Sequence, residues 1–275
     1  MNNYSSQKRI SVMLFFLVII LSSSSCSFRK VLRKGSTDEK HEAGLQYYAE
    51  EDYFRAGSLF EDILPIIRGQ ERAEIVNLYY AYCQFYQSQY ILSESYFKSF
   101  MTVYGRSDHL IEATYMHAYS LYMQSPESSL DQTSTILAVN ALQGFLNRYP
   151  NSDYAKQTDA LINELQVKLE QKAYDNAKLY YNITGIKGFR PALIVFENFE
   201  KDFPDSKFNQ EIAFLDIEVR FNYARRSTRR KQKERFQDTV NSYEKFINKY
   251  PKSEYLRQGG DYYEKSLKEL AKFEN

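Results

Sequence analysis

The sequence has little of what catalytic sites and tight turns are built from. Among 275 residues there are no tryptophans, two cysteines and three histidines, with only 10 glycines and 6 prolines. Because glycine and proline interrupt regular elements, their scarcity favours long helices. Lysine and arginine number 36 against 35 aspartates and glutamates, so no net field favours nucleic acid. We therefore expect a helical protein that does not bind nucleic acid.

Motifs that carry chemistry are also missing. His109 and His117 have no further histidine or cysteine at helical spacing, and His41 is isolated. There is no Gly-x-Ser-x-Gly elbow, no phosphate-binding glycine loop and no dinucleotide fingerprint. We predict that the protein is not an enzyme, binds no metal and needs no cofactor.

The two cysteines lie in different contexts. Cys83 falls within an aromatic helical run and is interpreted as a small buried residue. Cys26 follows two basic residues, an apolar run of about 12 residues from Ile10 to Leu21, and four serines. That run is shorter than the roughly 20 residues that span a bilayer, so residues 1–25 are interpreted as a cleaved leader. A cysteine after small residues resembles a bacterial lipoprotein signal and predicts a covalent lipid on Cys26; an ordinary signal peptide is the alternative.

Residues 26–37 are predicted to form a short lipidated tether. They carry Arg29, Lys30, Arg33 and Lys34 but no periodic apolar face. These charges can rest on anionic headgroups, and a solvated linker is the alternative interpretation.

One pattern recurs along the rest of the chain. A small residue is followed by large apolar residues at spacings of 4, 3 and 4, as in Ala192, Phe196, Phe199 and Phe203. These spacings lie on one helix face. Pro204 then ends the helix, and Ser206 can cap the next one. The pattern starts five times, at Ala56, Ser93, Ala138, Ala192 and Thr239, farther apart than the 34 residues of a minimal tetratricopeptide repeat (TPR).

These signals predict an all-α fold, a right-handed superhelical solenoid of about five TPR-like helix pairs with a C-terminal capping helix. We expect repeats 1–3 over residues 38–152, and repeats 4–5 with the cap over 153–275. The predicted pairs are 38–49 with 52–67, 72–87 with 91–104, 109–124 with 132–149, 153–181 with 191–203, and 207–225 with 233–250, followed by a helix at 253–272.

The first helices of a TPR solenoid line its binding surface. Their tyrosines predict a groove that recognises aromatic or aliphatic side chains, although any one of them is alternatively repeat core. The groove candidates are Tyr47, Tyr48, Tyr79, Tyr80 and Tyr82.

A basic run is interpreted as an exposed loop, or alternatively as a docking edge for an acidic protein or a membrane face. The residues of this edge are Arg225, Arg226, Arg229 and Arg230, continued by Lys231, Lys233 and Arg235.

Four segments together resemble the BamD family of outer-membrane barrel-assembly lipoproteins, over nearly all of the chain after Cys26. They are Tyr47-Tyr-Ala-Glu-Glu-Asp-Tyr53, Ser125-Pro-Glu-Ser-Ser-Leu-Asp-Gln-Thr133, Phe145-Leu-Asn-Arg-Tyr-Pro-Asn-Ser152 and Lys168-Leu-Glu-Gln-Lys-Ala-Tyr174. The chain departs from the family pattern at Gly105, where a proline is expected, and at Ser23, where the lipoprotein signal prefers leucine.

The resemblance implies a lipid-anchored protein on the periplasmic face of the outer membrane. It implies a BamA-type barrel insertase as partner, bound at its periplasmic POTRA domain through the C-terminal repeats. It also implies that the N-terminal repeats receive targeting peptides of unfolded outer-membrane proteins, which end in an aromatic residue. Two other functions remain open: a lipid-anchored solute- or glycan-binding component of a nutrient importer, although sugar sites favour the missing tryptophan, and a generic cell-envelope scaffold.

Overall fold

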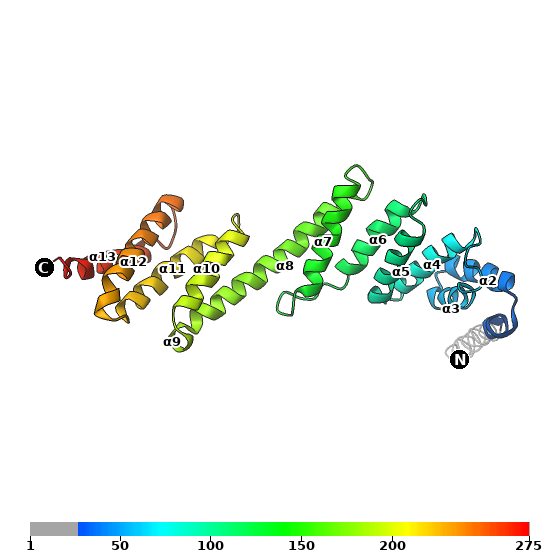
Figure 1. Ribbon diagram of the computed structural model, residues 1–275, viewed down its shortest axis with the longest axis horizontal. Helices are drawn as coiled ribbons and strands as arrows, with labels where there is room; N and C mark the ends of the chain where they lie inside the picture. Colours follow the sequence, from blue (N-terminus) through cyan, green and yellow to red (C-terminus); the bar gives the residue numbers. More distant parts are fainter. Residues whose placement is uncertain (1–26, 275) are drawn as a thin grey trace, which may run out of the picture. The chain divides into compact units, whose positions relative to one another are not determined.

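The structure, a computed structural model, describes residues 27–274, and its regular secondary structure is helical throughout that part of the chain (Figure 1). The all-α class is therefore confirmed. The proposed leader and Cys26 lie outside the described residues. Among the residues described, no helix combines the length and apolarity needed to cross a bilayer.

The helices follow one another in pairs joined by short connections (Figure 1). They are α2 (Thr37–Ala49), α3 (Tyr53–Ile63), α4 (Ala73–Tyr86), α5 (Tyr90–Val103), α6 (Leu110–Tyr122), α7 (Thr133–Arg148), α8 (Ala155–Asn182), α9 (Thr184–Lys187), α10 (Arg190–Asp202), α11 (Asn209–Arg225), α12 (Arg229–Lys249) and α13 (Leu256–Ala271). Every helix predicted from the sequence is present. The short α9 lies where only a turn was expected.

The recurring sequence pattern, which we call the register, identifies positions in the hydrophobic core. Its small first residue is buried in all five copies, at Ala56, Ser93, Ala138, Ala192 and Thr239. Small side chains at this position let two helices approach closely. The last register residue ends the helix in four copies, where Tyr104, Tyr149, Phe203 and Tyr250 are C-caps.

After two of the stops, the serine has a different role from the predicted helix cap. The Ser206 hydroxyl accepts from the Phe208 N–H at 3.0 Å, just before α11 begins, and donates to Glu170 on α8 at 2.6 Å. Ser107 repeats this arrangement, accepting from the His109 N–H and donating to Glu74 on α4. The hydroxyl therefore closes a turn and ties it to the first helix of the same pair.

The chain forms two compact units. Unit 1 comprises residues up to 126 together with 131–165, and unit 2 comprises 127–130 with 166 onward. The division falls within α8, which contributes to both. The expected boundary between repeats 1–3 and repeats 4–5, between residues 152 and 153, stays a prediction. In unit 1 the cores centre on buried rings such as Phe60, Phe97 and Phe145, and in unit 2 on Phe196, Phe199 and Phe246.

Two segments differ from the sequence interpretation. Residues 27–34, expected as an irregular tether, are helical. Helix α12 begins at Arg229 rather than near Lys233, because tertiary contacts hold its first two turns. The Arg229 guanidinium lies 3.8 Å from the centroid of the Phe273 ring, and that of Arg235 lies 3.7 Å from the Tyr223 ring. Most of the basic run is thus the start of a helix and not a loop.

Candidate functional site

A chain of aromatic rings crosses successive helix pairs of unit 1. The Tyr48 ring on α2 stacks on Tyr79 of α4 with 4.3 Å between centroids, and Tyr53 of α3 stacks on Tyr86 of α4 at 4.3 Å. Tyr48 and Tyr53 meet edge to face at 5.6 Å. These four rings thereby join the first helix pair to the second.

The series continues into the third pair. Phe85 contacts Tyr86 at 5.7 Å and Tyr119 of α6 at 5.6 Å, and Tyr119 stacks on Tyr122 at 5.5 Å. We call the whole set the aromatic ladder. It consists of Tyr48, Tyr53, Tyr79, Phe85, Tyr86, Tyr119 and Tyr122.

The ladder rings are only partly buried, and Tyr86 is 50% exposed. Stacked rings of this kind offer flat apolar faces beside polar hydroxyl groups. Such a surface suits aromatic or aliphatic side chains of a bound peptide, because a few aromatic anchors usually supply most of the binding energy in protein recognition.

The five tyrosines predicted from the sequence to line a groove lie in different surroundings. The structure brings Tyr48 and Tyr79 together in the ladder. Tyr47 has a different ring partner, since it meets Phe28 edge to face at 5.8 Å. Tyr80 and Tyr82 are core residues, 4% and 9% exposed.

The burial of Tyr80 and Tyr82 corrects their placement in an open groove. Tyr80 packs edge to face on Tyr96 at 4.6 Å, and Tyr82 packs on Phe97 at 5.0 Å. Both partners lie on α5, so these positions of α4 face the second helix of their own pair. Tyr80 and Tyr82 therefore belong to the core of the repeats, which was the alternative interpretation of these tyrosines from the sequence.

Five ladder residues were not predicted from the sequence: Tyr53, Phe85, Tyr86, Tyr119 and Tyr122. A signal for Tyr86 was available, because it lies seven residues after Tyr79 and so on the same face of α4. Nothing local to Tyr53 distinguishes it, since its ring reaches the ladder from the start of α3.

Burial raises the pKa of three tyrosine hydroxyl groups in and beneath this surface. The Tyr82 hydroxyl donates to Glu112 at 2.5 Å, and burial followed by this hydrogen bond raises the pKa of Tyr82. Burial, and then a hydrogen bond to Glu164, raises the pKa of Tyr122 to about 12. Burial likewise raises the pKa of Tyr115 to about 12, and its hydroxyl has no hydrogen-bond partner among the described residues.

Cys83 lies beneath this surface, fully buried, as the sequence predicted. Burial raises the pKa of its thiol to about 12. The thiolate is the reactive form of cysteine, so this side chain is a packing residue rather than a nucleophile.

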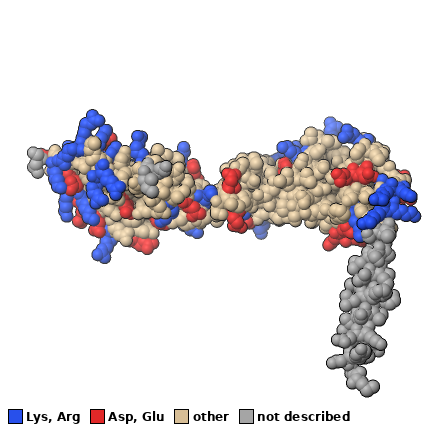
Figure 2. Space-filling model, turned by 90° about the horizontal axis from the view of Figure 1, so that it is seen from below, with Lys and Arg blue, Asp and Glu red and all other residues tan. Residues whose placement is uncertain are grey.

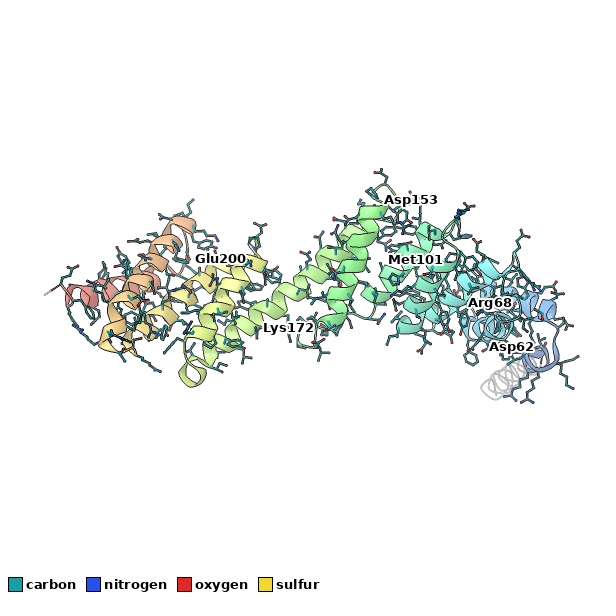
Figure 3. All side chains as sticks on the ribbon, viewed as in Figure 1. Asp62, Arg68, Met101, Asp153, Lys172 and Glu200 are labelled. Carbon is teal, nitrogen blue, oxygen red and sulfur yellow. The ribbon has the colours of Figure 1, made fainter. Side chains whose placement is uncertain are left out.

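A second candidate surface lies within unit 2, where α10, α11 and α12 line a cleft of about 440 Å³. Glu200 on α10, labelled in Figure 3, forms a 2.6 Å ion pair with Lys249 on α12. Asp216 on α11 accepts from Arg220 and Ser242, both at 2.6 Å. The cleft is therefore lined by charges of both signs, and it suits a polar protein surface more than an apolar ligand.

The four arginines proposed as a docking edge all lie around the connection between α11 and α12. Arg225 ends α11, Arg226 follows it, and Arg229 and Arg230 begin α12. All four are exposed, and Figure 2 shows lysine and arginine side chains gathered over these C-terminal helices. Arg226 also lies over the Phe189 ring at 5.6 Å, which anchors it.

Two of the histidines each lie beside one carboxylate. His109 lies 3.1 Å from Glu112, and His117 lies 3.3 Å from Glu94. No group of three or more histidine, cysteine, aspartate or glutamate side chains within residues 27–274 is arranged to hold a metal ion.

Comparison with protein families matches residues 33–187 to the family described as "YfiO: Outer membrane lipoprotein". The match contains the whole aromatic ladder and ends before α10. A search of curated proteins finds no match to this chain.

Proposed function

The chain belongs to the YfiO family of outer membrane lipoproteins, the family of BamD, and from this membership we propose that it is a scaffold of the barrel-assembly machinery. In this proposal the protein is anchored by a lipid on Cys26 at the periplasmic face of the outer membrane. It docks on a BamA-type insertase and helps to fold and insert β-barrel proteins.

The aromatic ladder is the observation that carries the client-binding part of the proposal. It lies in the N-terminal repeats and presents partly exposed rings from three consecutive helix pairs. Targeting peptides that end in an aromatic residue would place that ring on one of these faces, and tyrosine hydroxyls would donate to the peptide backbone.

Docking on the insertase is assigned to unit 2. The cleft between α10, α11 and α12 supplies charges of both signs, which favour a specific orientation of a folded polar partner. The exposed arginines Arg225, Arg226, Arg229 and Arg230 form a second docking edge in the same unit.

A non-enzymatic role is supported by the family and by the helical-repeat fold. Helical repeats act mainly by presenting extended surfaces to other macromolecules.

The test is affinity purification of the tagged full-length protein from detergent-solubilised outer membrane, with mass spectrometry of the proteins recovered. We expect stoichiometric recovery of a barrel protein that carries POTRA domains. A Cys26→Ala variant, which cannot be acylated, should be recovered from the membrane fraction in smaller amount than the parent protein.

Two other results would contradict the proposal. Recovery of a nutrient importer would indicate a solute- or glycan-binding component, and recovery of peptidoglycan enzymes would indicate a generic envelope scaffold.

A further inference from the structure

The helix of residues 27–34, which we call the basic helix, has two opposite faces. Phe28, Val31 and Leu32 are partly buried, whereas Arg29, Lys30, Arg33 and Lys34 are all exposed. At about 100° per residue, the four cations fall on one side of the helix and the three apolar residues on the other. The helix is therefore amphipathic. It is so short that the alternation of apolar and charged residues is hard to recognise in the sequence.

The apolar face is docked on the first helix pair. The Phe28 ring meets the Tyr47 ring of α2 edge to face at 5.8 Å. The guanidinium carbon of Arg55 on α3 lies 5.7 Å from the Phe28 centroid and 5.5 Å from the Tyr47 centroid. Arg55 thus interacts with both rings and links the basic helix to α2 and α3.

The connection to α2 is short and closed by hydrogen bonds. The Gly35 N–H donates to the Val31 carbonyl at 2.8 Å, and a Cβ at Gly35 would lie only 2.6 Å from that oxygen. Ser36 and Glu39 then form a reciprocal capping box at the start of α2. These contacts define the orientation of the basic helix relative to the first repeat.

The four cations of the basic helix keep their charge available to a partner. None of them forms an ion pair with another residue in the part of the chain that the structure describes. Lys30 acts only weakly on Glu39, whose pKa is lowered first by its hydrogen bonds with Ser36. Figure 2 shows this patch of lysine and arginine at the N-terminal end of the described chain.

We propose that the basic helix binds the anionic phospholipid headgroups of a bilayer through Arg29, Lys30, Arg33 and Lys34. Basic residues close to a membrane surface are attracted to anionic lipids, and a preformed helical face presents all four at once. The proposal rests on the proposed function for one point, that lipidation at Cys26 places this helix next to the membrane. The helix would thus add an electrostatic attraction to the anchoring that the lipid supplies.

The assay uses the mature chain, residues 26–275, with Cys26→Ser so that no acyl chain contributes. Sedimentation is measured with vesicles of phosphatidylcholine alone and of phosphatidylcholine mixed with an equal amount of phosphatidylglycerol. We expect binding to the mixed vesicles only, weakened by added salt because exposed charges are screened. Inorganic phosphate at the same ionic strength as sodium chloride should compete no better, since the ligand is a lipid surface.

Two matched variants separate the helix from bulk charge. R29Q/K30Q/R33Q/K34Q should reduce partitioning at least tenfold. R68Q/K98Q/R106Q/K156Q removes the same charge from four exposed positions of unit 1 and should bind as the parent does. Circular dichroism melting of each variant checks that the helices remain folded.

Equal losses in the two variants, or no binding by the parent chain, would overturn the proposal. Neither result bears on lipidation at Cys26 or on the insertase, which the purification of the full-length protein tests separately.

Discussion

The ring of Tyr48 lies on the ring of Tyr79 with 4.3 Å between centroids and 13° between planes. The two residues belong to different helix pairs, and both stay partly exposed. One contact therefore serves two purposes: it joins the first two repeats, and it forms part of the surface to which we assign client peptides.

Replacing both residues, Y48A/Y79A, should weaken binding of a peptide that ends in an aromatic residue by about tenfold or more, because aromatic anchors contribute most of the energy in such sites. Fluorescence anisotropy with a labelled peptide measures this. Tyr255→Ala is the control, because its ring stacks on Phe214 in unit 2, outside the ladder. Unchanged affinity in Y48A/Y79A would remove the ladder as the client site.

Tyr80→Ala should act on stability instead. Tyr80 is buried against Tyr96, so its truncation leaves a cavity and should cost about 3 kcal/mol or more in the free energy of unfolding. Urea unfolding followed by circular dichroism measures the change. Peptide affinity of the folded fraction should stay the same; a selective loss of affinity would return Tyr80 to the binding surface.

Replacing Gly44 or Gly144 by alanine should have opposite effects on the stability of the protein. A Cβ at Gly44 would lie 2.6 Å from the Phe60 ring, so Gly44→Ala should destabilise the protein by about 1–3 kcal/mol. Gly144 lies within α7 with no heavy atom within 4 Å of such a Cβ. Gly144→Ala should stabilise it by up to about 1 kcal/mol, because alanine favours helix. Chemical denaturation of both variants tests the pair, and destabilisation by Gly144→Ala would contradict the open position described here.

The protein should lose stability between pH 10 and 12. Burial raises the pKa of Tyr115 to about 12, from an ordinary value of 10. Below pH 10 the residue is protonated in both states, so its contribution is fully present. Above pH 10 the unfolded state loses the proton first, and the free energy of unfolding falls as the pH rises. Tyr115→Phe should show a shallower decline in urea unfolding across this range; identical slopes would contradict the assignment.

Charge reversal in the unit 2 cleft should disrupt insertase docking. Glu197 on α10 and Lys245 on α12 are exposed and line this cleft. E197K/K245E keeps the net charge but inverts the local pattern, and should reduce recovery of the POTRA-bearing partner at least fivefold in the purification described above. D205K/K252E makes the same exchange at exposed positions that do not line the cleft and should recover the partner normally. Equal recovery in both would move the docking site elsewhere.

Local sequence signals specify the helices and the face that each helix buries. A small residue and large apolar residues at spacings of 4, 3 and 4 define one helix face, and proline or glycine ends the helix. Ala192, Phe196 and Phe199 are all buried as that register requires. These features could be predicted because each depends on residues within a few turns of one another.

Packing between helices selects which side chains remain available at the surface. Tyr79 and Tyr80 are adjacent in sequence, yet one joins the ladder and the other enters the core, because a helix turns successive residues toward different neighbours. The docked basic helix and the early start of α12 likewise depend on rings supplied by distant residues, Tyr47 for one and Phe273 for the other. No local pattern encodes such pairings, since they form only when the helices pack.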